Sequence, residues 1–290
     1  MHNFLDYLKK RKLKFAAAIF IIFTGAVAYS FLWGRLFPLS PIVSGFEHKD
    51  FERAIIYYDK GVDIAKYGMI DKIIGEVEDF HKLKFNWKAE IFVFDSDEKY
   101  TRLTGHHARF VATPFYGRLF VAGRSHREAL EGKIHLDVYL KHELSHSLLY
   151  QNMSLYRSQY YPGWLMEGTA VYGSNQMGVD GYLSKEETLG KIKAGYFLDP
   201  DEWSTSLLKP EGKKVETFPL PNKFWFIYSE FACIVGDLIQ IYGKEKYLQY
   251  IKAPLTEDDA HTSFRRIFGI GFDEYINDFK KRSGYSKNGG

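Results

Sequence analysis

The chain has 290 residues, of which 46% are hydrophobic and 17% are aromatic, so it can bury a core and is not a disordered polypeptide. Its net charge is only +3, and much of the basic excess lies at the N-terminus, which leaves no basic surface typical of nucleic-acid binding. The single cysteine, Cys233, excludes an intramolecular disulfide and a cysteine-rich zinc ribbon. We therefore expect a folded protein with no nucleic-acid partner.

The N-terminus pairs a basic segment with an apolar one. Residues 1–14 contain a basic cluster that only one acidic residue, Asp6, opposes: Lys9, Lys10, Arg11, Lys12 and Lys14. Residues 15–33 carry no charge and, as a helix, would span roughly 28 Å, close to the hydrocarbon thickness of a bilayer. Because basic residues stay on the cytoplasmic side, we predict a transmembrane signal-anchor helix over 15–33, with the N-terminus cytoplasmic and the remainder periplasmic or extracellular.

A cleaved signal peptide is the alternative interpretation of this segment. The stretches 26–28 and 28–30 both offer the small-x-small pattern at which signal peptides are cut. The apolar region of a signal peptide is about 7 to 15 residues long, however, which is shorter than the run found here. Either way the rest of the chain is exported, and cleavage would make it a secreted protein.

Residues 34–48 are predicted to be a linker because they contain Pro38, Pro41 and Gly45. The main domain is expected over residues 49–282. Apolar residues at helical spacing predict one early helix within 64–83. Short runs of β-branched and aromatic residues predict strands over 54–58, 89–94, 109–113 and 118–122.

From Ile134 onwards the pattern becomes mostly helical. We expect helices over 135–151, 163–176, 184–195, 223–242, 244–252, 258–268 and 272–282, and a disordered tail over 283–290. A sheet followed by helices predicts an α+β fold: a small N-terminal mixed β-sheet with a helical C-terminal part, preceded by one transmembrane helix.

The most specific motif is His142-Glu143-Leu144-Ser145-His146, an H-E-x-x-H sequence. Residues four apart lie on one face of a helix, so both imidazoles can bind one metal ion. Glu143 is about 100° round the helix from His142, where it can activate a water molecule as a general base. The alternative is a pair of ordinary surface or capping histidines.

A catalytic zinc needs a third protein ligand and one open position. After a turn at Pro162 and Gly163, the segment 164–170 (WLMEGTA) places Glu167 among apolar residues early in the next predicted helix. A carboxylate in such surroundings requires a partner, and a cation is a suitable one. The alternative for Glu167 is a solvated position on the helix surface. We predict a single Zn²⁺ bound by His142, His146 and Glu167.

The motifs HELSH and WLMEGTAVY resemble those of the gluzincin metallopeptidases, the group that contains thermolysin and aminopeptidase N. The resemblance covers two motifs within about 30 residues and a compatible order of sheet and helices. It implies that His142, His146 and Glu167 bind zinc and that Glu143 activates the water. The tryptophan-leucine-x-glutamate-glycine context is closest to the aminopeptidase branch.

The sequence also departs from these relatives. The aminopeptidase motif glycine-x-methionine-glutamate-asparagine is absent, which removes the specific support for aminopeptidase action. Thermolysin-like enzymes place an aspartate four residues after the glutamate ligand to orient a histidine, and Val171 stands there in this chain. The partner of that histidine must therefore come from elsewhere.

The resemblance suggests two further features of the site. Tyr228, early in the predicted helix 223–242, corresponds to a tyrosine that can donate a hydrogen bond to the oxyanion, although a core tyrosine is the alternative. Residues 118–122 resemble the edge strand on which gluzincins hold an extended peptide, although an ordinary core strand is equally compatible with the sequence.

These features predict a membrane-anchored, exported zinc metallopeptidase that hydrolyses peptide or protein substrates, with Glu143 activating a zinc-bound water. The alternative is a non-catalytic, membrane-anchored pseudo-peptidase that acts as a binding module, because a fold and a motif do not by themselves establish turnover.

Overall fold

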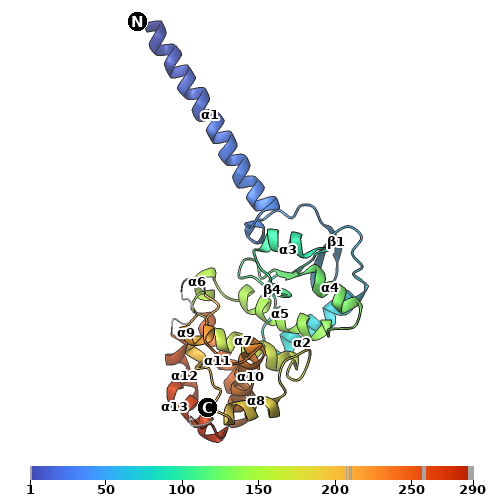
Figure 1. Ribbon diagram of the computed structural model, residues 1–290, viewed down its shortest axis with the longest axis vertical. Coiled ribbons are helices and arrows are strands. Elements are labelled where there is room, and N and C mark those ends of the chain that lie inside the picture. The colour runs from blue at the N-terminus through green and yellow to red at the C-terminus, as the bar shows by residue number, and fades with distance from the viewer. Residues whose placement is uncertain (1, 207, 209–210, 257–258, 287–290) are drawn as a thin grey trace.

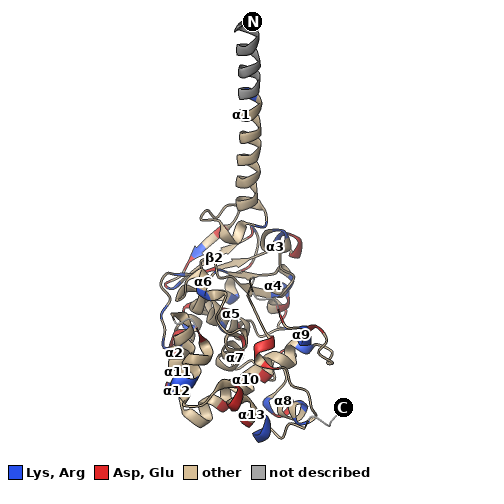
Figure 2. Cartoon of the chain, turned by 90° about the vertical axis from the view of Figure 1, so that its left-hand side faces the viewer, with Lys and Arg blue, Asp and Glu red and all other residues tan. Residues whose placement is uncertain are grey.

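The computed structural model describes residues 2–206, 208, 211–256 and 259–286, with side chains from residue 14 onward. Helix α1 (His2–Trp33) projects away from a body in which a part built on a sheet lies next to α1 and a helical part lies farther away (Figure 1). Residues 15–33 of α1 carry no charged side chain, whereas both signs of charge are spread over the body (Figure 2).

Five short strands form one mixed sheet with the order β1-β2-β3-β5-β4. Pairs β2–β3 and β3–β5 are parallel, and pairs β1–β2 and β4–β5 are antiparallel. The strands are β1 (Glu47–Asp50), β2 (Ala54–Tyr58), β3 (Ala89–Val93), β4 (Phe110–Ala112) and β5 (Leu119–Val121). The mixed sheet and four of its strands were predicted, and β1 is an addition that starts inside the expected linker.

Alternation along the strands gives the sheet two different buried faces. Ile91 and Val93 of β3 point to the face that α2 (Ile70–His81) and α5 (Leu136–Gln151) cover. Phe92 of β3 and Phe120 of β5 point to the opposite face, where they join an aromatic cluster with Phe37. The sheet is thus covered on both faces, and the chain just after α1 supplies part of one cover.

The structure decides between the two interpretations of residues 118–122, an edge strand or a core strand. Strand β5, within the predicted segment 118–122, lies between β3 and β4, so it is an interior strand. The edge strand on this side of the sheet is β4, because antiparallel pairing with β5 uses only one of its sides. The turn between them approaches α5 closely, since a Cβ on Gly117 (φ +60°) would lie 2.8 Å from the carbonyl oxygen of Ser147.

The prediction of one early helix was wrong, because α3 (Asp97–Thr104) and α4 (Gly123–Leu130) also precede α5. Each is only eight residues long and rich in charged residues, so it offers few apolar residues from which a helix can be predicted. Helix α3 is instead started by Ser96, whose side chain accepts a hydrogen bond from the Lys99 backbone N–H.

The helical part follows α5, and each helix predicted there is present with described ends within two residues of the prediction, whereas the four-residue helices α6 and α9 were not predicted. Its helices are α6 (Leu155–Ser158), α7 (Gly163–Ser174), α8 (Lys185–Lys193), α9 (Lys213–Glu216), α10 (Lys223–Tyr242), α11 (Lys244–Lys252), α12 (Ala260–Phe268) and α13 (Phe272–Arg282). Short 3-10 turns η1 (Phe37–Leu39), η2 (Ala65–Met69), η3 (Pro200–Glu202) and η4 (Ala253–Leu255) connect elements along the chain. The helices pack around one large core that α7 and α10 cross.

Two described helices are long and apolar enough to cross a membrane: residues 14–33 of α1, which are 0% buried, and α10, which is 56% buried. Helix α10 runs through the helical core, so its apolar composition is explained by packing. Helix α1 has no comparable cover and remains a candidate membrane span.

Two terminal expectations meet the structure only in part. The predicted linker 34–48 contains η1 and packs on the sheet through Phe37 and Phe46. The predicted disordered tail falls partly on residues 287–290, which lie outside the described residues. Of its described residues, Tyr285 contacts Phe197.

Candidate metal centre

Helix α5 lies between the sheet part and the helical part and carries the first half of the site. Twelve of its sixteen residues are buried, because β4, α2 and α7 surround it. His142 and His146 lie one turn apart on the same face, with their Nε2 atoms 3.0 Å from each other. The H-E-x-x-H sequence is therefore helical and buried, as expected, and the alternative of surface or capping histidines is excluded.

Helix α7 brings the third residue to the same point. Oε2 of Glu167 lies 3.4 Å from Nε2 of His142 and 3.5 Å from Nε2 of His146. The next residue, Gly168, is where α10 approaches, since a Cβ there would lie 2.7 Å from the carbonyl oxygen of Phe231. The absence of a side chain at Gly168 therefore allows α10 to hold α7 against α5.

The three nearest atoms have the spacing of zinc ligands. A tetrahedral zinc with ligands at about 2.0 to 2.1 Å has ligand atoms about 3.4 Å apart, and the three distances here are 3.0, 3.4 and 3.5 Å. Oε2 of Glu167 is buried and has no hydrogen-bond partner among the described residues. Two imidazoles and one carboxylate also form a donor set that zinc prefers, so the residues fit the ion.

The electrostatics of the cluster favour a cation. Although burial by itself raises the pKa of Glu167, the adjacent His146 and His142 lower it to about 2. For His146, burial lowers the pKa, but the neighbouring Glu167 carboxylate has the larger effect, so the pKa of His146 is raised. The carboxylate thus stays charged inside the protein, where a charge requires a positive partner.

The histidine partner that the sequence did not reveal is Gln176. Its Oε1 atom lies 2.7 Å from Nδ1 of His142, which leaves Nε2 free to face Glu167. Helix α7 ends with Asn175 in the left-handed conformation (φ 56°), and the Gln176 N–H then donates to the Val171 carbonyl. This C-cap turns Gln176 toward His142. In the sequence, only an asparagine at the end of the predicted helix could have indicated such a turn.

Glu143, the predicted base, is buried beside the cluster but does not belong to it. Burial raises its pKa, the nearby His142 and His146 lower it, and the Ala112 backbone N–H also favours the charged form. Since Ala112 is the last residue of the edge strand, Glu143 lies between the metal cluster and that strand. A carboxylate with a raised pKa suits proton transfer.

Tyr228 enters the site from α10, as expected, and is half-buried. Its ring centroid lies 6.5 Å from that of His142, and burial followed by the charge of Glu167 raises its pKa well above the usual range. Its phenol is therefore protonated and available as a donor. Tyr182 was not predicted as a site residue. Its ring centroid lies 6.4 Å from that of Tyr228, and it faces the same cluster.

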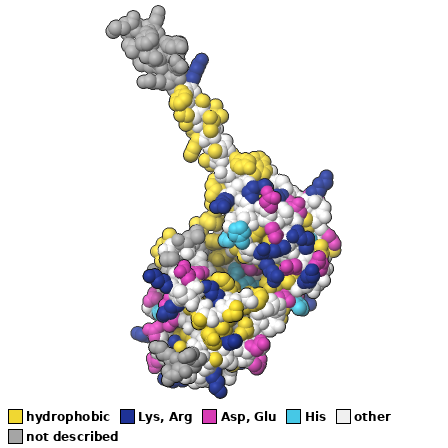
Figure 3. Space-filling view, viewed as in Figure 1, with side chains coloured by type: hydrophobic (Ala, Val, Ile, Leu, Met, Phe, Trp, Pro, Cys, Tyr) yellow, Lys and Arg dark blue, Asp and Glu magenta, His cyan; other side chains and the backbone are white. Residues whose placement is uncertain are grey.

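A cleft of about 740 Å³ gives access to these residues and lies between the sheet part and the helical part (Figure 3). This volume is typical of a ligand site. Its walls contain Glu143, Tyr228 and all three residues of the metal cluster. The edge strand β4 also lines it, whereas β5 does not.

Another group of possible metal ligands, Asp201, His261 and Asp273, is exposed. Nε2 of His261 lies 3.2 Å from Asp201, so an ordinary surface ion pair accounts for this contact. We therefore assign this exposed cluster no function.

No protein-family model and no curated protein sequence matches the chain.

Proposed function

We propose that the chain is a membrane-anchored, exported metallopeptidase of the gluzincin type, which hydrolyses peptide bonds with one zinc ion. The observation that carries the proposal is the buried cluster of His142, His146 and Glu167, which opens to a cleft with Glu143 beside it. Burying the charged carboxylate of Glu167, whose Oε2 atom has no hydrogen-bond partner among the described residues, is costly unless a cation compensates it.

The surrounding residues support hydrolysis. A zinc ion bound by the cluster would acidify a water molecule and polarise the substrate carbonyl. Glu143 can accept a proton from the attacking water and return it to the leaving amine. Tyr228 can donate a hydrogen bond to the carbonyl oxygen as negative charge develops on it. The free side of β4 can pair with an extended substrate and hold it in register.

The apolar helix supports membrane attachment. Residues 14–33 are uncharged after Lys14, and the structure buries none of this stretch. Tyr29 and Trp33 lie near its end, as aromatic residues do at membrane interfaces. With the basic cluster before the apolar stretch of α1, the positive-inside rule supports a body in the periplasm or outside the cell.

Replacing Glu143 tests the proposed chemistry. We expect Glu143→Gln to retain zinc and to lower kcat on a mixture of fluorogenic peptides by about 10² to 10⁴-fold, the contribution of a general base. Glu186→Gln, on the exposed surface of α8, is the matched control and should leave both quantities unchanged. Undiminished cleavage by Glu143→Gln would remove Glu143 as the base. A zinc-loaded wild type that cleaves nothing would favour the binding-module alternative.

A further inference from the structure

The body is joined to α1 without a flexible stalk. Only three residues separate Trp33, the last residue of α1, from Phe37, whose side chain is 0% exposed in the aromatic cluster of the sheet. The chain turns sharply between them, because the Leu36 N–H donates to the Ser30 carbonyl and the Phe37 N–H to the Gly34 carbonyl. The end of the candidate membrane span is therefore also the start of the folded body.

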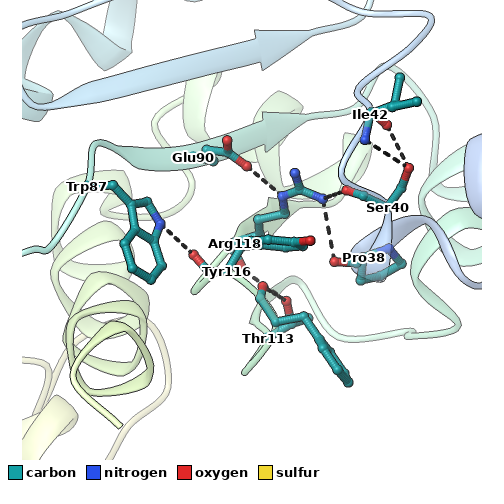
Figure 4. Close-up of polar contacts among 9 residues, drawn as sticks. Pro38, Ser40, Ile42, Trp87, Glu90, Thr113, Tyr116 and Arg118 are labelled. Carbon is teal, nitrogen blue, oxygen red and sulfur yellow. Dashed lines mark hydrogen bonds and ion pairs between the residues drawn. The ribbon is translucent and has the colours of Figure 1, made fainter. Parts of the chain in front are cut away.

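A buried arginine fixes this connection to the sheet (Figure 4). Arg118 is only 3% exposed, and its Nη1 atom donates to the carbonyl oxygens of Ser40 at 2.6 Å and Pro38 at 3.5 Å. Its Nε atom donates to Glu90 of β3 at 2.5 Å. One guanidinium thus ties the segment after α1 to the central strands, and charge-assisted contacts of this kind are strong and directional.

The cleft of the metal centre extends to the same connection. Arg35, Pro38 and Leu39 line it together with Glu143. Arg35 is two residues beyond the end of α1, so one end of the cleft lies at the level where a membrane-spanning α1 would leave the bilayer. Opposite the sheet, α10 contributes the exposed aromatic residue Trp225 to the wall.

We propose that the cleft takes the juxtamembrane segments of other membrane-anchored polypeptides, in extended form. This inference rests on the proposed function, because it assumes that α1 spans the membrane and that the site cleaves peptide bonds. The short connection, which Arg118 holds to the sheet, keeps the metal centre at the bilayer surface. There it can reach the segment of another polypeptide that leaves the membrane nearby. A substrate in solution would gain nothing from this arrangement, whereas one anchored in the same bilayer gains effective concentration.

A ladder of anchored peptides tests the inference without relying on turnover. Each peptide has a transmembrane helix of leucine and alanine, a Gly/Ser spacer of 4, 12 or 40 residues and one extended apolar test segment. The peptides are reconstituted in phosphatidylcholine vesicles with full-length Glu143→Gln protein that carries p-benzoylphenylalanine in place of Trp225. The same photoreactive residue in place of Ile241, which is exposed at the end of α10 and does not line the cleft, is the control.

We expect photocrosslinking at Trp225 to be about tenfold stronger with the shortest spacer than with the longest, because a longer tether spreads the segment over a larger volume. The Ile241 position should show no such preference. Equal crosslinking at all spacer lengths, equal crosslinking of a free peptide, or crosslinking to phospholipid in place of peptide would overturn the inference.

A second variant changes the height of the body above the bilayer. Twelve Gly/Ser residues inserted between Trp33 and Gly34 leave η1 and the Arg118 clamp intact and add about 20 Å of reach. We expect the spacer length that gives the strongest crosslinking to increase, and an unchanged dependence on spacer length would contradict the inference. If wild type cleaves none of the peptides while crosslinking keeps its dependence on spacer length, the proposed chemistry fails and the docking inference stands.

Discussion

The two helices that hold the metal cluster do so in different ways. Helix α5 supplies His142 and Glu143 from one turn and His146 from the next, so helical geometry alone brings them together. Helix α7 supplies only Glu167, which reaches the cluster because α10 presses on Gly168 from behind. Changes on α5 should therefore remove chemistry and leave the fold intact, whereas changes around α7 should act through position.

Removing a ligand on either helix should have the largest effect. We expect His146→Ala and Glu167→Ala each to abolish zinc binding at micromolar zinc and all peptide cleavage, since a catalytic zinc needs three protein ligands. The control is His107→Ala, on an exposed loop outside the cleft. Zinc content by mass spectrometry of the native protein checks this, and a variant that keeps stoichiometric zinc would contradict the ligand set.

A single methyl group at Gly168 should separate position from chemistry. Its Cβ would lie 2.7 Å from the carbonyl oxygen of Phe231, a backbone atom that cannot move cheaply, so we expect Gly168→Ala to cost about 1 to 3 kcal/mol in the free energy of unfolding. Cleavage should fall as well, by about 10²-fold, because Glu167 shifts with the helix.

Gly190 of α8 provides the matched control for this change. A Cβ there meets nothing within 4 Å, so Gly190→Ala should be neutral or slightly stabilising. Thermal unfolding of both variants decides the point. Equal unfolding temperatures would show that the close approach of α7 and α10 does not position the ligand.

Substitutions of Tyr228 and Tyr182 test whether α10 contributes to the chemistry of the site as well as holding α7 in place. We expect Tyr228→Phe to lower kcat by about 10²-fold with zinc content unchanged, as the loss of one oxyanion donor does. Tyr182→Phe, on the same cleft, should have a smaller effect because its ring contacts Tyr228 and not His142. Steady-state kinetics separates them, and the reverse order would transfer the donor role to Tyr182.

The smallest effect should come from the residue that orients His142. We expect Gln176→Ala to weaken zinc binding by about 10 to 100-fold, the usual cost of losing such a partner, and Gln176→Glu to restore it because the acceptor is retained. Competition with a chelator measures the zinc Kd. If both variants bind zinc as tightly as wild type, the contact does not support the ligand.

The contrast between α5 and α7 also explains how much of the site could be predicted from the sequence. His142, Glu143 and His146 could be predicted because the interactions are local and the helix repeat is fixed. Glu167 could be predicted only from its apolar surroundings and a family resemblance, and Gln176 could not, because a left-handed residue at Asn175 directs it. The sequence left residues 118–122 open as an edge strand or a core strand, because hydrophobic runs do not specify the order of strands in a sheet, and the structure makes β5 interior.

The fold shows the same limit. The longer helices of the helical part, such as α10, are rich in apolar residues and were predicted to within two residues at their ends, whereas the short α3, α4, α6 and α9 were missed. The segment after α1 looked like a linker because of its prolines. Its attachment depends on Arg118, a residue 78 positions away from Ser40 that no local pattern connects to it.

The central claim is that His142, His146 and Glu167 bind one zinc ion. X-ray absorption at the zinc edge, on full-length protein purified in detergent, tests it most directly. We predict one zinc per chain with four light-atom neighbours at about 2.0 to 2.1 Å, the scattering pattern of two imidazoles and no sulfur. A protein that binds no zinc under these conditions, or an unchanged spectrum in the His142→Ala/His146→Ala double variant, would contradict the account.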